Sequence, residues 1–418
     1  MGYNFIQLVE VELIFQTLDD KTECVGIYAD NNLVFDMEEF PSNLSKTWKY
    51  SSYLRDLDVE YISLYLEGKN ISETIPEYLK DDWDDVLKKI NAFKRSLSIS
   101  QVNTFENCFF DLVPNRFLVE FCEVKNKITQ HIANNVPKPD RYEFYKHVCM
   151  MLEDLSHHKV TIDRQVVSAY VNSSKLKNHA KKILEASPYV KYNQFGTKTG
   201  RLTTKRGSIP ILTMSKEFRS AVQPQNDYFI ELDFNGAEVR TLLGLLGKQQ
   251  PQGDVHDFHL NEIFTSISTR AQAKVAFFAW LYGSKRAANS EETSKLEEFY
   301  EKDNLLKECW DGNTVTTPFR KKISDASEHH ALNYLVQSTA AELTLKQALK
   351  IEHLLRTRSA GSHLAFLIHD AVIIDMKKED ENLLKSLVAL MSTTNFGDFL
   401  VNIKKGKTLG SLRDIKVG

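Results

Sequence analysis

The sequence has little of what characterises secreted, membrane-spanning or zinc-cluster proteins. Its 418 residues include 5 cysteines and no Cys-x-x-Cys pair, so neither a disulfide framework nor a zinc knuckle is predicted. No apolar run approaches the roughly 18 residues that a membrane span requires. The first residues lack the basic and apolar segments of an export signal, so we expect a cytoplasmic protein with no membrane partner.

Composition and charge narrow the possibilities further. With 42% hydrophobic and 26% charged residues, the chain is typical of a globular protein rather than a disordered, collagenous or coiled-coil one. Residues 1–100 carry 10 Lys/Arg and 19 Asp/Glu, a net charge of −9, whereas the whole chain carries −3. Residues 101–418 therefore carry +6. We expect the acidic first part and the basic remainder to have different partners.

A basic segment occupies residues 188–224. Seven Lys or Arg residues and one Glu give it a local charge of +6, and the aromatic residues Tyr189, Tyr192 and Phe195 are interspersed in its first half. Its charged residues are Lys191, Lys198, Arg201, Lys205, Arg206, Lys216, Glu217 and Arg219. This pattern suits a surface that follows a phosphate backbone, and a solvated loop is the alternative.

The first part of the chain is predicted to be a separate α/β module. Two β-prone runs around a polar turn predict a hairpin over residues 23–35. Helical periodicity follows over residues 81–97 and over most of residues 114–169. A polar break at residues 134–140 predicts a linker, and we place the module boundary after residue 135.

Two acidic residues come at the ends of β-prone runs. A predicted strand over residues 228–232 leads to Asp233, after which the apolar period becomes helical. Two apolar runs within residues 364–375 meet at His369-Asp370. Burying a carboxylate between apolar strands is costly unless it is paired, hydrogen-bonded or bound to a metal. Asp233 and Asp370 therefore suit a pair of Mg²⁺ ions for phosphoryl or nucleotidyl transfer, and a turn or cap role for each is the alternative.

A third set of residues lies on one predicted helix face. Arg270, Lys274, Phe278 and Tyr282 recur every four residues, a spacing that drifts only about 40° per step around a helix. They form a stripe that is cationic at its start and aromatic at its end. Such a face suits a triphosphate at one end and a nucleobase at the other. An amphipathic helix with a solvated cationic end is the alternative.

Two side-chain amides lie one helical turn apart further along the chain. Asn333 and Gln337 precede a run of small residues, Thr339-Ala340-Ala341. Amides on such a face can donate to the minor-groove acceptors that Watson–Crick pairs largely share, which tests pair geometry without reading sequence. Capping or core-amide roles are the alternative.

Together these residues resemble the motifs of family A DNA polymerases, the class of bacterial DNA polymerase I and many phage replicases. The family's Arg-x3-Lys-x3-Phe-x3-Tyr-Gly motif is matched in full by residues 270–283. Its Asp-Tyr-Ser-Gln-Ile-Glu-Leu-Arg motif is similar to residues 233–240, and its Glu-Arg-x-Ala-x-Asn-x3-Gln-Gly-Thr-Ala-Ala-Asp element to residues 328–342. Its His-Asp-Glu turn corresponds to residues 369–371 and its Thr-Gly-Arg-Leu-Ser motif to residues 199–203. The five motifs keep the family's order, within residues 188–418.

The resemblance implies a role for each matched residue. Asp233 and Asp370 would be catalytic and would bind two Mg²⁺ ions, or Mn²⁺ in their place. Arg270, His256 and a catalytic Lys274 would contact the triphosphate, while Phe278 and Tyr282 would face the nascent base pair. Glu238 matches the family's steric gate, where a carboxylate takes the space of a ribose 2′-hydroxyl. The residues that would hold the primer end and minor groove are Arg201, Asn333, Gln337 and His369.

The resemblance also implies an α+β fold in the shape of a right hand, with an antiparallel palm sheet and helical fingers. The predicted order is an acidic accessory module (1–135), a reduced helical thumb (136–187), the first part of the palm (188–253), the fingers (254–330) and the second part of the palm (331–418). The accessory module would hold a degenerate exonuclease position or dock a partner. The thumb is predicted to be reduced because only about two dozen residues separate Asp163 from Pro188.

The sequence departs from the family pattern at three places that bear on the expected activity. Ala371 replaces the Glu beside the catalytic Asp, and His329 replaces an Arg. The first module has no Asp-x-Glu proofreading motif, the nearest candidate being Glu-Val-Glu at residues 10–12. We therefore expect a template-directed, primer-dependent DNA polymerase without 3′–5′ proofreading. Its expected partners are primer-template DNA, dNTPs and a processivity or replisome protein, in a host cytoplasm if the chain is phage-encoded.

Two alternative functions remain open at this point. A single-subunit RNA polymerase or primase-like relative shares the Arg/Lys/Tyr helix, but it needs room for the 2′-hydroxyl that Glu238 would exclude. A catalytically weakened DNA-binding replication scaffold is suggested by Ala371 and the short thumb. The presence of both Asp residues and the whole stripe argues against that scaffold.

Overall fold

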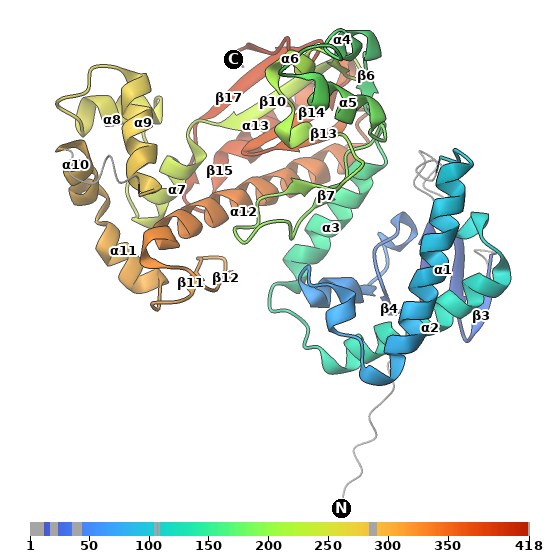
Figure 1. Ribbon diagram of the computed structural model, residues 1–418. Coiled ribbons are helices and arrows are strands. Elements are labelled where there is room, and N and C mark those ends of the chain that lie inside the picture. The colour runs from blue at the N-terminus through green and yellow to red at the C-terminus, as the bar shows by residue number, and fades with distance from the viewer. Residues whose placement is uncertain are drawn as a thin grey trace, which may run out of the picture. The chain divides into compact units, whose positions relative to one another are not determined.

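The computed structural model describes residues 12–16, 24–35, 44–103, 107, 109–283 and 291–416. The chain forms two compact units, Met1–Lys159 and Val160–Gly418 (Figure 1). The boundary predicted after residue 135 lies inside the first unit, and the assignment of segments to thumb, fingers and palm remains a prediction. Of the nearest proofreading candidate, residues 10 and 11 lie outside the described residues. Within the described part, no helix combines the length and the apolar character needed to cross a membrane.

The first unit contains a small antiparallel sheet in the order β1-β2-β3. Its strands are β1 (Leu13–Gln16), β2 (Cys24–Ala29) and β3 (Asn32–Val34). β2 and β3 form the predicted hairpin, and its turn residues Asp30 and Asn31 have φ values of 47° and 64°. Asp and Asn tolerate this left-handed conformation better than most residues do. A second, parallel pair joins β4 (Lys46–Thr47) to β5 (Glu60–Tyr61).

Helices make up most of the remainder of the first unit. They are α1 (Lys80–Ile99), α2 (Asn115–Asn135) and α3 (Tyr142–Ser156). Short 3-10 helices cover Ser52–Leu54, Ile62–Leu66, Ile71–Glu73, Glu77–Leu79 and Phe109–Leu112. The predicted helical segments and the polar break are confirmed, because α2 ends at Asn135 and α3 begins at Tyr142.

An antiparallel sheet forms the centre of the second unit, in the order β13-β14-β10-β17-β18. Its strands are β10 (Tyr228–Phe234), β13 (His363–Ile368), β14 (Ala371–Met376), β17 (Val401–Gly406) and β18 (Arg413–Asp414). β14 is buried along its whole length, as its continuous apolar run predicts. Two helices, α12 (Glu328–Thr357) and α13 (Leu384–Ser392), pack on the sheet and on each other (Figure 1).

A group of helices lies beyond the end of the sheet where β10 finishes (Figure 1). These are α7 (Ala237–Leu245), α8 (Val255–Glu262), α9 (Arg270–Leu281), α10 (Glu291–Tyr300) and α11 (Lys302–Cys309). They share one apolar core with the first turns of α12, in which Phe277, Tyr300 and Leu335 are fully buried. This core ties α9 firmly to the neighbouring helices and so fixes which of its faces is left for ligands.

Short elements complete the second unit. The helices are α4 (Arg164–Ser168), α5 (Lys177–Glu185), α6 (Lys216–Arg219) and the 3-10 helices Ile211–Thr213 and Lys378–Leu383. The strands pair as β6 (Thr161–Ile162) with β9 (Val222–Gln223), β7 (Tyr192–Asn193) with β8 (Thr203–Thr204), β11 (Val315–Thr316) with β12 (Lys322–Ile323), and β15 (Thr393–Thr394) with β16 (Gly397–Asp398). The predicted α+β fold class is thus confirmed, with helices gathered beside a mostly antiparallel sheet.

Candidate active site

The two predicted metal-binding carboxylates lie on β10 and in the turn that precedes its neighbouring strand, β14. β10 pairs antiparallel with β14, and this register sets Asp233 opposite Ala371. Asp370 is the residue before Ala371, in the tight turn between β13 and β14, where His369 has a φ of 54°. Both carboxylates are half-buried. The structure therefore brings together the two residues that the sequence placed at separate strand ends.

The charges of these carboxylates oppose each other's ionisation. Burial, together with the charges of Glu231 and Asp370, raises the pKa of Asp233 to about 6. Burial also raises the pKa of Asp370, and the charges of Arg201 and His369 oppose that rise. Like charges so placed favour a divalent cation, and carboxylate oxygens suit Mg²⁺, which takes its other ligands from water and phosphates. Within the described ranges, no group of three or more His, Cys, Asp or Glu side chains could hold a metal.

A second charged pair lies beside Asp233 and was not anticipated from the sequence. Glu231 shares a face of β10 with Asp233, because the two are two positions apart along a strand. Lys404 of β17 is in register with Glu231, and its Nζ lies 2.5 Å from Glu231 Oε1. Asn402, opposite Asp233 on the same strand, hydrogen-bonds to the Asp233 side chain. No motif marks residues 402 and 404, because only the pairing of β17 with β10 places them here.

Glu238 connects three separate segments of the site. It lies in the first turn of α7 with 4% of its surface exposed. Its Oε1 accepts a hydrogen bond from Arg201 Nη2, and its Oε2 accepts one of 2.9 Å from the Tyr282 hydroxyl. Burial raises the pKa of Glu238, although Arg201 and Tyr282 oppose the rise. Burial and the charge of Glu238 raise the pKa of Tyr282 to about 12, so the Tyr282 hydroxyl remains a proton donor at neutral pH.

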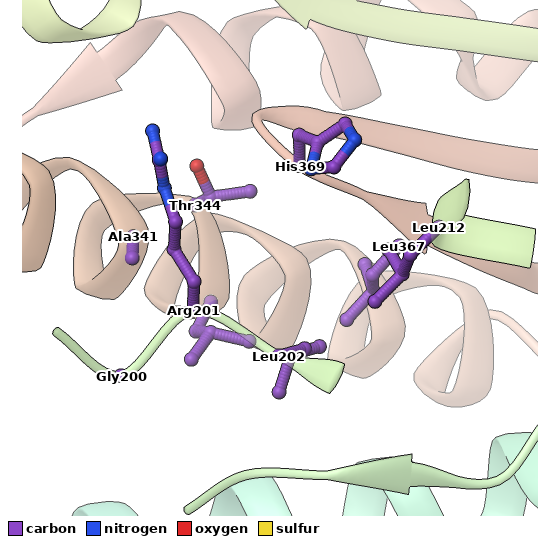
Figure 2. Close-up of a pocket in the computed structure, with 9 residues that line it drawn as sticks. Gly200, Arg201, Leu202, Leu212, Ala341, Thr344, Leu367 and His369 are labelled. Carbon is purple, nitrogen blue, oxygen red and sulfur yellow. The ribbon is translucent and has the colours of Figure 1, made fainter. Parts of the chain in front are cut away.

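Arg201 and His369, both predicted to contact the primer end, line one pocket (Figure 2). Its other walls come from Leu367, before the turn, and from Ala341 and Thr344 of α12. Figure 2 shows the Arg201 side chain extending beside α12, while His369 projects from the turn. Because the charge of Arg201 acts on Asp370, this pocket adjoins the carboxylate pair.

The cationic end of the predicted stripe faces away from the apolar core, whereas Phe278 is partly buried and also packs against that core. The cationic residues Arg270 and Lys274 are exposed in the first turns, after Thr269 caps the helix. The rings of Phe278 and Tyr282 stack at the other end, with centroids 5.6 Å apart and 19° between their planes. The buried residues of α9 are Ala273, Phe277, Trp280 and Leu281. The cationic and aromatic ends of the stripe are thus both available to a ligand.

Asp254 holds Arg270 to the start of α8. Its Oδ1 caps the helix by accepting bonds from the His256 and Asp257 amides at 2.9 and 3.1 Å. Arg270 donates two hydrogen bonds to the same carboxylate, and Asn235 Nδ2 adds a third side-chain bond at 2.8 Å. Burial opposes ionisation of Asp254, but these bonds outweigh it and hold the pKa of that carboxyl well below its usual range. Sequence analysis assigned no role to Asp254 or Asn235.

His256, predicted to contact the triphosphate, is almost fully buried behind the stripe. Burial lowers its pKa to about 4, and the nearby charges of Arg270 and Lys274 act in the same direction. The ring lies 6.0 Å from that of Phe278 between centroids, and its Nδ1 is buried with no hydrogen-bond partner among the described residues. His256 is therefore neutral at pH 7.

The remaining predicted residues lie along α12. Gln337 hydrogen-bonds to the Tyr282 side chain, which joins it to the Glu238 group. Asn333, one turn earlier, has a buried Oδ1 with no hydrogen-bond partner in the described part of the chain. His329 lies against Gly283, where a Cβ atom would come 2.3 Å from the His329 ring. The structure therefore gathers Gln337 into the site and leaves Asn333 beside it with unused hydrogen-bonding capacity.

Comparison with known proteins identifies relatives of one kind for about half of the chain. No protein-family model matches. The chain is similar to DNA polymerase I of Geobacillus stearothermophilus (26% identity over 243 residues), of Lactococcus lactis (25% over 246) and of Caldicellulosiruptor bescii (22% over 240). Each match covers 47% or 48% of this chain and 28% of the relative's length. The chain thus spans less than a third of these relatives.

A solved structure extends the similarity to the fold. The chain resembles the polymerase domain of Pol1 from M. smegmatis, determined with a DNA primer-template and a dNTP, with a TM-score of 0.56. That likeness covers 71% of this chain and 76% of the solved chain at 13% sequence identity. The resemblance to family A DNA polymerases and the predicted polymerase fold are therefore confirmed.

Proposed function

We propose that this protein is a template-directed, primer-dependent DNA polymerase that adds dNTPs to a primer 3′-hydroxyl. The observation that carries the proposal is the position of Asp233, opposite Ala371 in the pairing of β10 with β14, next to Asp370 in the turn that precedes β14. Both lie beside the network of Glu238, Arg201 and Tyr282. Such a carboxylate pair next to a cationic and aromatic helix suits nucleotidyl transfer on an extended polyphosphate. Similarity to several DNA polymerase I sequences supports the same activity.

The chain's own residues would bind and orient the two reactants. Asp233 and Asp370 would hold two Mg²⁺ ions, which when bound acidify the primer 3′-hydroxyl and neutralise charge on the triphosphate. Arg270 and Lys274 would contact the phosphates from the exposed face of α9. His256, neutral at pH 7 because burial lowers its pKa to about 4, would offer a hydrogen bond rather than a charge.

Base and sugar would be selected by the other end of the site. The stacked rings of Phe278 and Tyr282 offer an apolar surface for the nascent base pair. Glu238, fixed by two hydrogen bonds, would occupy the space that a ribose 2′-hydroxyl needs. Gln337 and Asn333 would reach minor-groove acceptors of the primer end. This arrangement favours deoxynucleotides, unlike an RNA polymerase or primase-like relative.

We further propose that the enzyme lacks 3′–5′ proofreading and needs help to stay on DNA. Between Asp163 and Pro188 the structure has two short helices, α4 of 5 residues and α5 of 9 residues, where the family is expected to have a long thumb. A processivity or replisome protein, or the acidic first unit acting as its docking surface, would compensate for this. Ala371 in place of Glu leaves two carboxylates to hold the ions.

The proposal is tested with Asp233→Asn and Asp370→Asn in the full-length protein. A primed template is offered dNTPs or rNTPs with Mg²⁺ or Mn²⁺, and product length is measured on gels. We expect each variant to lose primer extension by a factor of at least about 10³, because each removes a charged ligand from the metal site. DNA affinity should stay close to that of the wild type, since phosphate contacts elsewhere supply most of it.

Two results would overturn this assignment. Substantial extension by either variant would show that these carboxylates do not hold the catalytic ions. Absence of any extension by the wild-type protein with either metal, despite normal DNA binding, would favour a non-catalytic replication scaffold.

A further inference from the structure

The guanidinium of Arg270 binds the Asp254 carboxylate through two hydrogen bonds. Arg270 donates from Nε to Asp254 Oδ1 at 2.9 Å and from Nη2 to Oδ2 at 2.6 Å. These two donors form one edge of the guanidinium fork, and bidentate binding through such an edge is how arginine recognises carboxylates and phosphates alike. The edge that suits a triphosphate is therefore already occupied by a carboxylate of the same chain.

The two partners are not equally free to move. Asp254 is held by the amides of His256 and Asp257 at the start of α8 and by Asn235 Nδ2, and 20% of its side chain is exposed. Arg270 begins α9, and 47% of its side chain is exposed. Asp254 would remain in place if the ion pair opened, whereas the arginine side chain could swing towards solvent. The structure thus combines a firmly held carboxylate with a more exposed guanidinium.

We infer that Asp254 occupies the phosphate-binding edge of Arg270, so that an incoming triphosphate must displace this carboxylate to use the arginine. This inference rests on the proposed function. Asp254 is then a positioning residue that sets nucleotide affinity through Arg270. A ligand with several phosphate charges competes with one carboxylate better than a singly charged anion does, so the contact discriminates against weakly charged ligands.

The neighbouring charges suit competition between Asp254 and a triphosphate for Arg270, rather than a permanent structural ion pair. Hydrogen bonds keep the pKa of Asp254 well below its usual range, so the carboxylate is ionised throughout the neutral range. Hydrogen bonds to Asp254 also raise the pKa of Arg270, with the charge of Asp257 acting in the same direction. Lys274 lies one turn along the exposed face of α9, where a second set of phosphate oxygens would meet it.

The test measures nucleotide affinity without catalysis. A fluorescent N-methylanthraniloyl derivative of dATP with Mg²⁺ is titrated into the full-length protein in the absence of DNA. Asp254→Asn removes the charge but keeps a side-chain oxygen that can cap α8. A partly exposed ion pair contributes about 0.2–1 kcal/mol, so releasing Arg270 should lower the Kd by about 1.4- to fivefold.

Asp257→Asn is the matched control. Asp257 lies on the same helix turn and acts on Arg270 through its charge, but it accepts no hydrogen bond from Arg270. We expect Asp257→Asn to lower the Kd less than Asp254→Asn does. A Kd for Asp254→Asn that equals or exceeds that of the wild type would overturn the inference. Asp254→Ser, which also keeps a cap, gives a second measurement if the Asn variant melts at a lower temperature.

Arg270→Gln separates failure of this inference from failure of the proposed function. Suppose that Arg270→Gln weakens nucleotide binding while Asp254→Asn leaves it unchanged or weaker. The proposed contact of Arg270 with the triphosphate is then supported, and the proposed role of Asp254 is contradicted. If Arg270→Gln leaves nucleotide binding unchanged, the proposed triphosphate contact and the inference built on it both fail.

Discussion

Glu238 and Asp233 are both carboxylates removed from bulk water, yet their neighbours suit them to different tasks. Glu238 accepts hydrogen bonds from Arg201 and Tyr282, which fix its position and leave little room around it. Asp233 has other carboxylates near it, and their charges raise its pKa to about 6 along with burial. A fixed, hydrogen-bonded carboxylate suits exclusion of a substrate group, whereas a mutually repelling pair suits cation binding.

Replacing Glu238 should relax sugar selection. We expect Glu238→Ala to incorporate ribonucleotides, because it removes the carboxylate from the space that the 2′-hydroxyl would take. The measurement is the ratio of kcat/KM for a dNTP and the matching rNTP in primer extension, which should fall by at least about tenfold. Tyr282→Phe, which deletes only the hydroxyl that donates to Oε2, is the control and should change the ratio less. Unchanged sugar discrimination in Glu238→Ala would contradict the proposal that Glu238 excludes the ribose 2′-hydroxyl.

The raised pKa of Asp233 predicts a pH-dependent stability in the absence of metal. Its folded-state pKa of about 6 exceeds the usual value of about 3.9, so the folded protein binds this proton more tightly than the unfolded chain does. The resulting stabilisation is fully present below about pH 4 and is lost as the pH rises through about 6. Urea unfolding in EDTA at pH 5 and pH 7.5 should show an extra loss of stability for wild type that Asp233→Asn lacks. If the unfolding free energies of the two proteins changed equally between pH 5 and pH 7.5, the contribution of Asp233 would be contradicted.

At the scale of elements, the junction of β10 and α7 depends on one glycine. Gly236 precedes α7 with a φ of 68°, a conformation that costs residues with a Cβ about 1–2 kcal/mol. A Cβ atom there would also lie 2.4 Å from Val255 Cγ1, next to Asp254 and His256. The sharp change from strand to helix therefore also sets the distance between Asp233 and the start of α8.

Gly236→Ala should destabilise the protein more than the backbone conformation alone explains. Gly247→Ala is the matched control, because Gly247 has a φ of 62° and nothing within 4 Å of an added Cβ. We expect unfolding free energy, measured in urea, to fall by about 1–2 kcal/mol for Gly247→Ala and by at least 1 kcal/mol more for Gly236→Ala. Equal losses of unfolding free energy in the two variants would show that Val255 moves away from the added Cβ at no energetic cost.

At the scale of the whole molecule, the two units differ in charge and therefore in the ligands that they can bind. The acidic first unit is unsuited to phosphate contacts, whereas the second contains the basic segment and the candidate site. The proposed reduced thumb, two helices of 5 and 9 residues, would surround little of a duplex. We therefore expect few phosphate contacts and fast dissociation from DNA.

Low processivity is the measurable consequence. Primer extension by the isolated protein, with a heparin trap that limits each enzyme molecule to one encounter, should give products only a few nucleotides longer than the primer. Raising the salt concentration should shorten them further, because phosphate contacts weaken with salt. Long products under these conditions would show that the protein holds DNA unaided and would remove the reason to expect a processivity partner.

Much of this site was accessible from the sequence because its residues are tied to local patterns. A strand ending in Asp233, apolar runs meeting at Asp370 and the four-residue spacing of Arg270, Lys274, Phe278 and Tyr282 all depend on neighbours along the chain. The structure has β10, β13, β14 and α9 at these places. Side-chain alternation in strands and the helical repeat are properties of the backbone, so sequence alone determines which residues share a face.

Tertiary structure alone decided the contacts that set the positions and pKa values of those residues. Lys404 and Asn402 lie beside Glu231 and Asp233 only because β17 pairs with β10 in one register, across more than 160 positions of chain. The bond from Arg201 to Glu238 and the fork of Arg270 on Asp254 likewise join segments that no local pattern links. Strand register and helix docking are set by the summed packing of the whole core, so these pairings, and the pKa values that depend on them, could not be obtained from residue spacing.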